Sequence, residues 1–101
     1  MTDHLTYRHC MIRGRVQGVG YRAFVEREAL QRGLQGFVRN RADGSVEALL
    51  VGPAAEIDDA VATLRRGPPG SRVDAIDLSD AEPEALAARR PGERFSVLRT
   101  V

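Results

Sequence analysis

The stretch Gly14-Arg-Val-Gln-Gly-Val-Gly-Tyr-Arg22 joins two different hydrophobic patterns in this chain. Before it, residues 7–16 alternate between apolar and polar, with Cys10 and Ile12 on the apolar side, which predicts a half-buried strand. After it, apolar residues recur at positions 21, 24, 25 and 29, which is the period of an amphipathic helix. The first unit is therefore predicted to be a strand, a glycine-rich loop and a helix.

The rest of the chain continues with a hairpin and then repeats the strand and helix. The predicted elements are strands at 37–40 and 46–51, a helix at 56–66, a strand at 73–78, a loop or single helical turn at 84–90, and a short strand at 95–99. The alternation slips between Ala75 and Ile76, which predicts a β-bulge. The order predicts one α+β domain over residues 1–101, a ferredoxin-like βαββαβ sandwich whose antiparallel sheet carries both helices on one face.

Composition narrows the classes of function. The chain has 101 residues and a formal net charge of +1, so no overall positive field attracts nucleic acid or a membrane surface. All 15 basic residues are arginines, which excludes Schiff-base and P-loop lysine chemistry. One cysteine, no long apolar run and no export signal at the start predict a cytoplasmic protein without a disulfide. We expect a monomer whose partner is a small molecule.

The glycine-rich loop is the first candidate for chemistry. Its glycines permit positive φ angles, so several backbone N–H groups can turn inward around an anion. The start of the following helix adds a partial positive charge, and Arg22 in its first turn offers a planar fork of donors suited to phosphate oxygens. The alternative is a tight turn between strand and helix, with Arg22 as a solvated surface residue.

The second candidate is Asn40, which is placed at the end of the second predicted strand. A side-chain amide has both a donor and an acceptor, so it can hold a water molecule and a ligand oxygen together. The alternative is that Asn40 only forms the turn before Ala42-Asp-Gly44, which is a common role of asparagine.

One motif points to a different function and is rejected. The segment Gly18-Val-Gly-Tyr-Arg-Ala23 fits the dinucleotide fingerprint, with Asp43 about 20 residues further on. A hairpin follows this helix, however, where that fold requires the next parallel strand, and 101 residues cannot hold its two halves. NAD or FAD binding is therefore not expected.

Two motifs of the chain resemble those of a known family. The segment from Gly14 to Arg22 is similar to the signature of the acylphosphatases, and Gly36-Phe-Val-Arg-Asn-Arg-Ala-Asp-Gly44 resembles their second signature. The similarity extends over nearly the whole chain, including Gly52-Pro53 after the third strand. It implies the ferredoxin-like fold and hydrolysis of the carboxyl–phosphate bond of acyl phosphates. No cluster of acids or histidines lies at either motif, so we expect no metal and no cofactor.

The resemblance also implies roles for individual residues. Arg22 corresponds to the family's phosphate-binding catalytic arginine, and Asn40 corresponds to its water-positioning asparagine. The expected phosphate-binding loop comprises Arg15, Val16, Gln17, Gly18, Val19, Gly20, Tyr21 and Arg22. The chain departs from the family pattern at Phe37, where Trp is common, and at Arg41, where a small hydroxyl residue is frequent. We expect Phe37 to change packing only, and Arg41 to add charge near the site.

The remaining candidates and alternatives are weaker. His9 is predicted to lie on the sheet surface and Cys10 in the core. A sensor of small anions is expected to lack Arg22 or Asn40, and an RNA-binding domain needs exposed aromatic residues on the open sheet face. A domain of a larger carbamoyl-phosphate enzyme is a further alternative, and the start at Met1 and the last predicted strand argue against it. Phosphate release from acetyl or benzoyl phosphate would separate these hypotheses.

Overall fold

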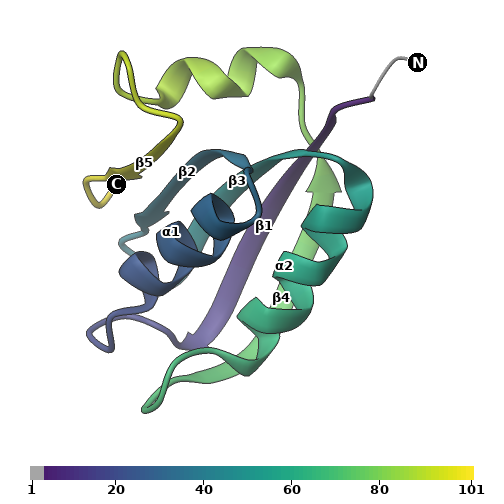
Figure 1. The fold of residues 1–101 in the computed structure, drawn as a ribbon. Coiled ribbons are helices and arrows are strands. Elements are labelled where there is room, and N and C mark those ends of the chain that lie inside the picture. Colours follow the sequence, from purple (N-terminus) through teal and green to yellow (C-terminus); the bar gives the residue numbers. More distant parts are fainter. Residues whose placement is uncertain (1–3) are drawn as a thin grey trace.

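A computed structural model describes residues 4–101 as a five-stranded sheet with two helices packed on the same face (Figure 1). The elements are β1 (Thr6–Arg15), α1 (Tyr21–Gln31), β2 (Gln35–Asn40), β3 (Val46–Gly52), α2 (Ala54–Arg66), β4 (Arg72–Asp80), the 3₁₀ helix η1 (Pro83–Ala88) and β5 (Phe95–Leu98). The strand order is β4-β1-β3-β2-β5. None of the described helices is long and apolar enough to cross a membrane.

The main core lies between the sheet and the two long helices. The residues predicted to face inward from α1 are buried, and so are those predicted for α2: Tyr21, Phe24, Val25 and Ala29, then Ile57, Ala60, Val61 and Leu64. They pack against the same face of β1 as Cys10 and Ile12, which are fully buried. Burying these apolar side chains is what fixes both helices on one face.

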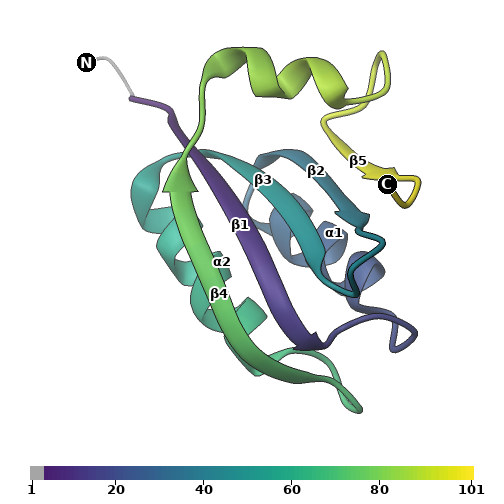
Figure 2. The same cartoon turned by 180° about the vertical axis from the view of Figure 1, so that it is seen from behind.

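The opposite face of the sheet is only partly covered. Beyond β4 the chain crosses this face and forms η1 along one end of it (Figure 2). A second apolar cluster forms there, in which Phe37, Leu49 and Val51 are covered by Ala85 and Leu86. Phe37 is therefore 4% exposed and offers no ring for a base to stack on, which removes the main basis for an RNA-binding domain.

The sheet differs from the prediction in two details. It is mixed, because β5 pairs with β2 in parallel whereas the other neighbouring strands are antiparallel. Alternation alone gives no strand direction, so only the pairing could reveal this. The bulge lies earlier in β4 than predicted: consecutive residues Arg13 and Gly14 of β1 pair with Ala75 and Val73, which leaves Asp74 unmatched.

Candidate active site

The loop between β1 and α1 combines anchored side chains with free backbone donors. Val16 is buried and Val19 packs against the core, so both side chains hold the loop down. Gly18 and Gly20 have φ angles of 76° and 77°, in the left-handed region that favours glycine. Among the described residues, none accepts a hydrogen bond from an N–H group of residues 17–20. The loop therefore offers unused donors in the pattern that binds anions.

Helix α1 begins directly after this loop and without a side-chain cap. Gly20 occupies the N-cap position, and the first turn of α1 contains no acidic residue. The unpaired N–H groups and the positive end of the helix dipole are therefore not neutralised by a side chain of the first turn. An anion in the loop would supply the missing acceptors.

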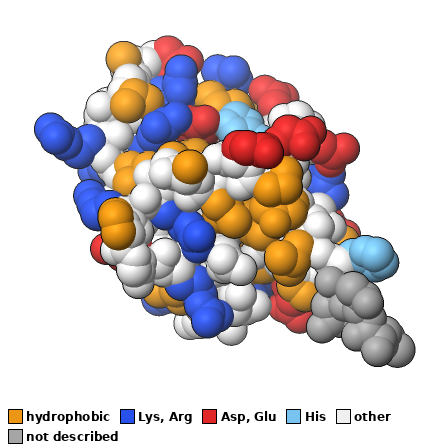
Figure 3. All heavy atoms as spheres, turned by 90° about the horizontal axis from the view of Figure 1, so that it is seen from above, with side chains coloured by type: hydrophobic (Ala, Val, Ile, Leu, Met, Phe, Trp, Pro, Cys, Tyr) orange, Lys and Arg blue, Asp and Glu red, His pale blue; other side chains and the backbone are white. Residues whose placement is uncertain are grey.

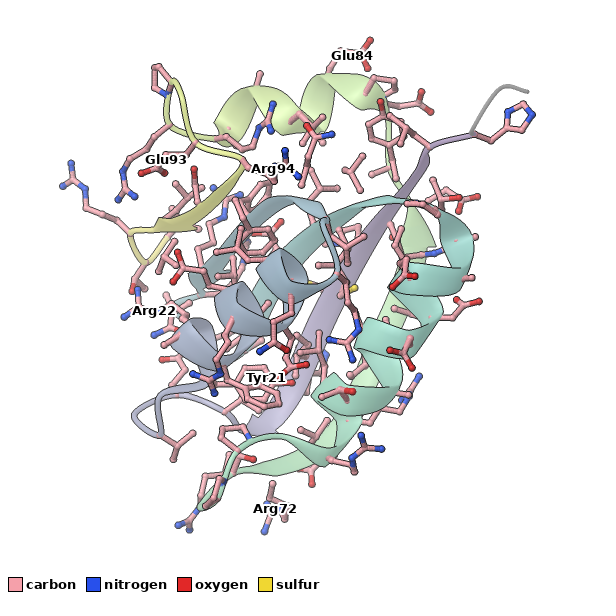
Figure 4. All side chains as sticks on the ribbon, viewed as in Figure 1. Tyr21, Arg22, Arg72, Glu84, Glu93 and Arg94 are labelled. Atoms are coloured by element: carbon pink, nitrogen blue, oxygen red, sulfur yellow. The ribbon has the colours of Figure 1, made fainter. Side chains whose placement is uncertain are left out.

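Tyr21 and Arg22 point to opposite sides of the start of α1 (Figure 4). The Tyr21 hydroxyl lies toward α2 and donates a hydrogen bond of 2.7 Å to the Leu64 carbonyl, and burial raises the pKa of this phenol. Arg22 is half-buried, and its Nη1 donates a hydrogen bond of 3.2 Å to the Leu98 carbonyl at the end of β5. Arg22 is therefore held by a contact across the sheet edge, unlike a freely solvated surface arginine.

Asn40 is the last residue of β2 and lies on the helix face of the sheet, as Val38 does two residues before it. Its side-chain Oδ1 is buried, and no described residue donates a hydrogen bond to it. A buried acceptor without a donor is costly, so such an atom commonly marks a position for water or a ligand.

The turn after β2 does not use the Asn40 side chain. The carboxylate of Asp43 accepts hydrogen bonds from the backbone N–H and the hydroxyl of Ser45, at 2.9 and 2.6 Å, and these bonds lower the Asp43 pKa. Asp43 therefore makes the side-chain contact that an Asx turn requires. The side-chain contact of this turn thus comes from Asp43 and not from Asn40.

Strand β5 and the residues after it contact both Arg22 and the backbone around Asn40. Leu98, which accepts the hydrogen bond from Arg22, pairs with Arg39, the neighbour of Asn40. The Val101 N–H then donates to the Asn40 carbonyl at 3.1 Å, and the Val101 carbonyl accepts from the Ala42 N–H at 2.7 Å. These contacts were not predicted, because no sequence pattern identified a partner for the last strand.

The side chain of Gln17 was also missed, since only its backbone was assigned to the loop. Its Nε2 donates two hydrogen bonds of 2.8 Å, to the carbonyls of Arg41 and Ser45 in the β2–β3 turn. A signal was available: Gln17 is the one side chain with amide donors among the glycines and valines of residues 16–20.

Arg41 was predicted to add charge near the site. Its side chain instead lies on the opposite face of the sheet and contacts a carboxylate there. Its Nη1 lies 3.1 Å from an oxygen of Glu47, a carboxylate that Arg39 and His9 also contact at 2.7 Å. Burial alone would raise the Glu47 pKa, but the hydrogen bonds from Arg39, His9 and Arg41 outweigh it and lower this pKa to about 2. The Arg41 charge is thus paired.

We call Glu47 with Arg39, Arg41 and His9 the Glu47 cluster. Figure 3, which looks at the molecule from the end that carries η1, shows basic, acidic and histidine side chains gathered along one rim.

His9 is half-buried on the open face, as predicted. Cys10 is fully buried in the core, and this burial raises the pKa of its thiol to about 12. A thiol with such a pKa stays protonated near neutral pH and is a poor nucleophile.

A surface hollow lies apart from Arg22 and Asn40. A hollow of about 140 Å³ lies between the end of β1 and the β2–β3 turn, lined by Arg13, Gly14, Asp43, Gly44 and Ser45. It contains neither Arg22 nor Asn40, so the hollow and the polar site are different places. Within residues 4–101, no group of three or more His, Cys, Asp or Glu side chains is placed to hold a metal ion. The unpaired N–H groups of residues 17–20 make the loop the stronger candidate.

The sequence model described as Acylphosphatase matches residues 8–95 of the chain. The chain belongs to the acylphosphatase family. A curated acylphosphatase of Bradyrhizobium diazoefficiens is 59% identical over 91 residues, which are 90% of this chain and 92% of that protein. Acylphosphatases are hydrolases, so the class of enzyme predicted from the motifs is confirmed.

Solved structures of acylphosphatases share the fold. The crystal structure of the acylphosphatase from Bacillus subtilis has a TM-score of 0.78 and 40% identity, and it covers 94% of this chain and 99% of its own. The acylphosphatase from Coxiella burnetii has a TM-score of 0.80 and 28% identity, with 93% of each chain covered. The ferredoxin-like α+β fold predicted from the order of the elements is confirmed, with a parallel strand added at one edge of the sheet.

Proposed function

We propose that this protein hydrolyses the carboxyl–phosphate bond of acyl phosphates, with the loop and Arg22 binding the phosphoryl group and Asn40 positioning the water. Membership of the acylphosphatase family supports the reaction. The observation that carries the assignment of roles is the buried Asn40 Oδ1, which has no donor among the described residues. The Arg22 guanidinium is hydrogen-bonded to β5, the strand that pairs with the one that carries Asn40.

Binding of the negatively charged phosphoryl group requires several hydrogen-bond donors and a positive charge close together. The proposed binding groups are the backbone amides of residues 15–21 and the guanidinium of Arg22. In phosphoryl transfer, charge spreads over the three non-bridging oxygens in the transition state, so positioned donors lower the barrier. One donor of this kind contributes about 3 to 4 kcal/mol in comparable sites.

The water needs orientation more than activation. A carboxylate is a good leaving group, so no general acid is required to expel it. Asn40 Oδ1 would accept a hydrogen bond from the water. This bond would orient a lone pair of the water oxygen toward phosphorus, in line with the bond that breaks. The oxygen–phosphorus bond to the carboxylate breaks as the bond to water forms, and a phosphoryl oxygen takes the proton of the water. The products are a carboxylate and inorganic phosphate.

The proposal is tested with the purified chain and benzoyl phosphate as substrate. We expect inorganic phosphate to be released by the unaltered chain, and hydrolysis to be inhibited competitively by added phosphate or sulfate. Arg22→Ala should remove both properties, because the guanidinium contacts the phosphoryl group in the ground state and the transition state.

Arg27→Ala is the matched control, since Arg27 belongs to the same helix, is exposed and lies over the Phe24 ring. This variant should hydrolyse benzoyl phosphate like the unaltered chain. If Arg22→Ala retained the activity of the control, the role given to Arg22 would be wrong. Absence of hydrolysis by the unaltered chain would contradict the proposed reaction itself.

The site is built from one chain, since the loop, α1, β2 and the residues after β5 supply all its proposed parts. This supports action as a monomer on a small acyl phosphate. The monomeric state and the cytoplasmic location stay predictions, and sedimentation of the purified chain would test the first of them.

A further inference from the structure

The Gln17 side chain connects the loop to the strand end that carries Asn40. Its Nε2 donates to the carbonyls of Arg41 and Ser45, both at 2.8 Å. Both acceptors are carbonyl oxygens, so only the amide nitrogen of Gln17 can make these two bonds. The Arg41 N–H also donates to the Ser45 carbonyl at 2.8 Å, so Gln17 joins a turn that is already closed.

The two bonds act on the backbone beside Asn40. Arg41 follows Asn40 directly, so Gln17 holds the next carbonyl along the chain from it. From the C-terminal segment, Val101 donates to the Asn40 carbonyl and accepts from the Ala42 N–H. The backbone around Asn40 is therefore fixed by two separate segments, the loop through Gln17 and the residues after β5.

Asn40 depends on this backbone because its Oδ1 has no hydrogen-bond partner among residues 4–101. A side chain whose acceptor is not hydrogen-bonded takes its position from its backbone and its packing alone. Displacing a reacting group by about 1 Å can cost about 100-fold in rate. A small shift of the β2–β3 turn relative to the loop would thus misplace the water that Asn40 holds.

We propose that Gln17 is a positioning residue that sets the distance between the phosphate-binding loop and Asn40. The inference rests on the proposed function, and it concerns the side chain of Gln17 and not its backbone amide. Because Val16 and Val19 also anchor the loop and Leu98 holds Arg22, loss of the Gln17 amide should affect turnover far more than phosphate binding.

The first test compares Gln17→Met with the unaltered chain. Methionine has nearly the length of glutamine and no donor, so it removes both hydrogen bonds with little change of volume. We expect kcat for benzoyl phosphate to fall by about 10- to 100-fold, and the inhibition constant of inorganic phosphate to stay within about twofold. An unchanged kcat would overturn the inference, and so would an equal loss of kcat and phosphate binding.

The second test uses Gln17→Glu and the pH. Near pH 7 the carboxylate of this variant faces two carbonyl oxygens and cannot donate. As the pH falls toward about 4, protonation restores one donor. The kcat of Gln17→Glu relative to the unaltered chain should therefore rise as the pH falls, whereas the relative kcat of Gln17→Met should not. Gln31→Glu, at the exposed end of α1, is the control for added charge and should match the unaltered chain at each pH.

A double-mutant cycle separates positioning from loss of structure. If Gln17 acts through Asn40, then Gln17→Met should lower kcat much less in an Asn40→Ala background than in the unaltered chain. Equal losses in both backgrounds would overturn the inference while leaving the proposed function intact, because the unaltered chain would still hydrolyse benzoyl phosphate. An inactive unaltered chain would overturn both.

Discussion

Polar side chains at the end of β2 have different surroundings on the two faces of the sheet. Arg39 and Arg41 point to the open face, where both guanidinium groups contact the Glu47 carboxylate. Asn40, between them, lies on the helix face, and its Oδ1 has no donor among the described residues. The arginines on the open face thus have a hydrogen-bond partner within the protein, whereas the Asn40 acceptor on the helix face remains available to a ligand or water.

This difference indicates that some polar residues stabilise the fold and others serve the reaction. The Glu47 carboxylate is bonded to all three basic side chains of the cluster, so it can hold the β2–β3 hairpin without taking part in the reaction. The loop, Arg22 and Asn40 instead present donors and an acceptor that only an external group can use fully. Substitution of Arg22 or Asn40 should therefore change catalysis, and substitution of Glu47 should change the free energy of unfolding.

Removal of Arg22 should give the largest effect on catalysis. Arg22→Ala deletes the proposed charged contact to the phosphoryl group, so we expect kcat/KM for benzoyl phosphate to fall by about 1000-fold or more. Competitive inhibition by phosphate should disappear with it. Steady-state kinetics measure both, and a variant that is inactive but still inhibited by phosphate would place the charged contact elsewhere.

Asn40→Ala should give a large effect of a different kind. We expect kcat to fall by about 100- to 1000-fold, because the water loses its acceptor, while the inhibition constant of phosphate is nearly unchanged. The melting temperature should not fall, since the substitution removes a buried acceptor to which no residue of the described chain donates. A lower melting temperature with full kcat would restore the interpretation of Asn40 as a structural residue.

Glu47→Gln should lower the free energy of unfolding and leave turnover nearly unchanged. The amide leaves the cationic groups of the Glu47 cluster without their carboxylate, so we expect the free energy of unfolding to fall by about 1 to 3 kcal/mol near neutral pH. Urea denaturation measures this change. Asp77→Asn is the matched control on the open face, because its carboxylate is 67% exposed beside Arg13 and should contribute no more than about 0.5 kcal/mol.

The same carboxylate gives the unaltered chain a pH dependence. The Glu47 pKa is about 2 in the folded protein, below its ordinary value of 4.5, so its stabilising effect is complete above about pH 5 and is lost as the pH falls toward 2. We expect a loss of about 1 to 2 kcal/mol across this window, since the partners of Glu47 are partly exposed to water. Glu47→Gln should show a shallower fall; an equally steep fall would assign the effect to other carboxylates.

The smallest expected effect is that of a chelator. Neither face of the sheet gathers three metal-ligating side chains within the described residues, and the proposed mechanism uses only backbone amides, Arg22 and Asn40. Hydrolysis of benzoyl phosphate should therefore proceed at the same rate in excess EDTA. A requirement for added Mg²⁺ would contradict the proposed mechanism.

The sequence predicted the helix face better than the open face. Periodicity identified the buried positions of α1 and α2 because apolar burial leaves a regular pattern, and glycines at 18 and 20 marked the loop. The Glu47 cluster was missed, since a single acid in the apolar segment Val46-Glu-Ala-Leu-Leu-Val51 shows no periodicity of its own. The contacts of Gln17 and Val101 depend on tertiary pairing, which local patterns do not record.

The pairing of β2 with β5 has a consequence for how the protein folds. Gly36 pairs with Phe95, and Arg22 reaches Leu98, so the two sides of the site are far apart along the chain. Contacts of such long sequence separation require closure of a large loop, which slows their formation. During refolding, burial of the aromatic residues of α1 can therefore precede the meeting of these segments. Enzymatic activity would return only after β5 has paired with β2, so its recovery would report on that long-range pairing.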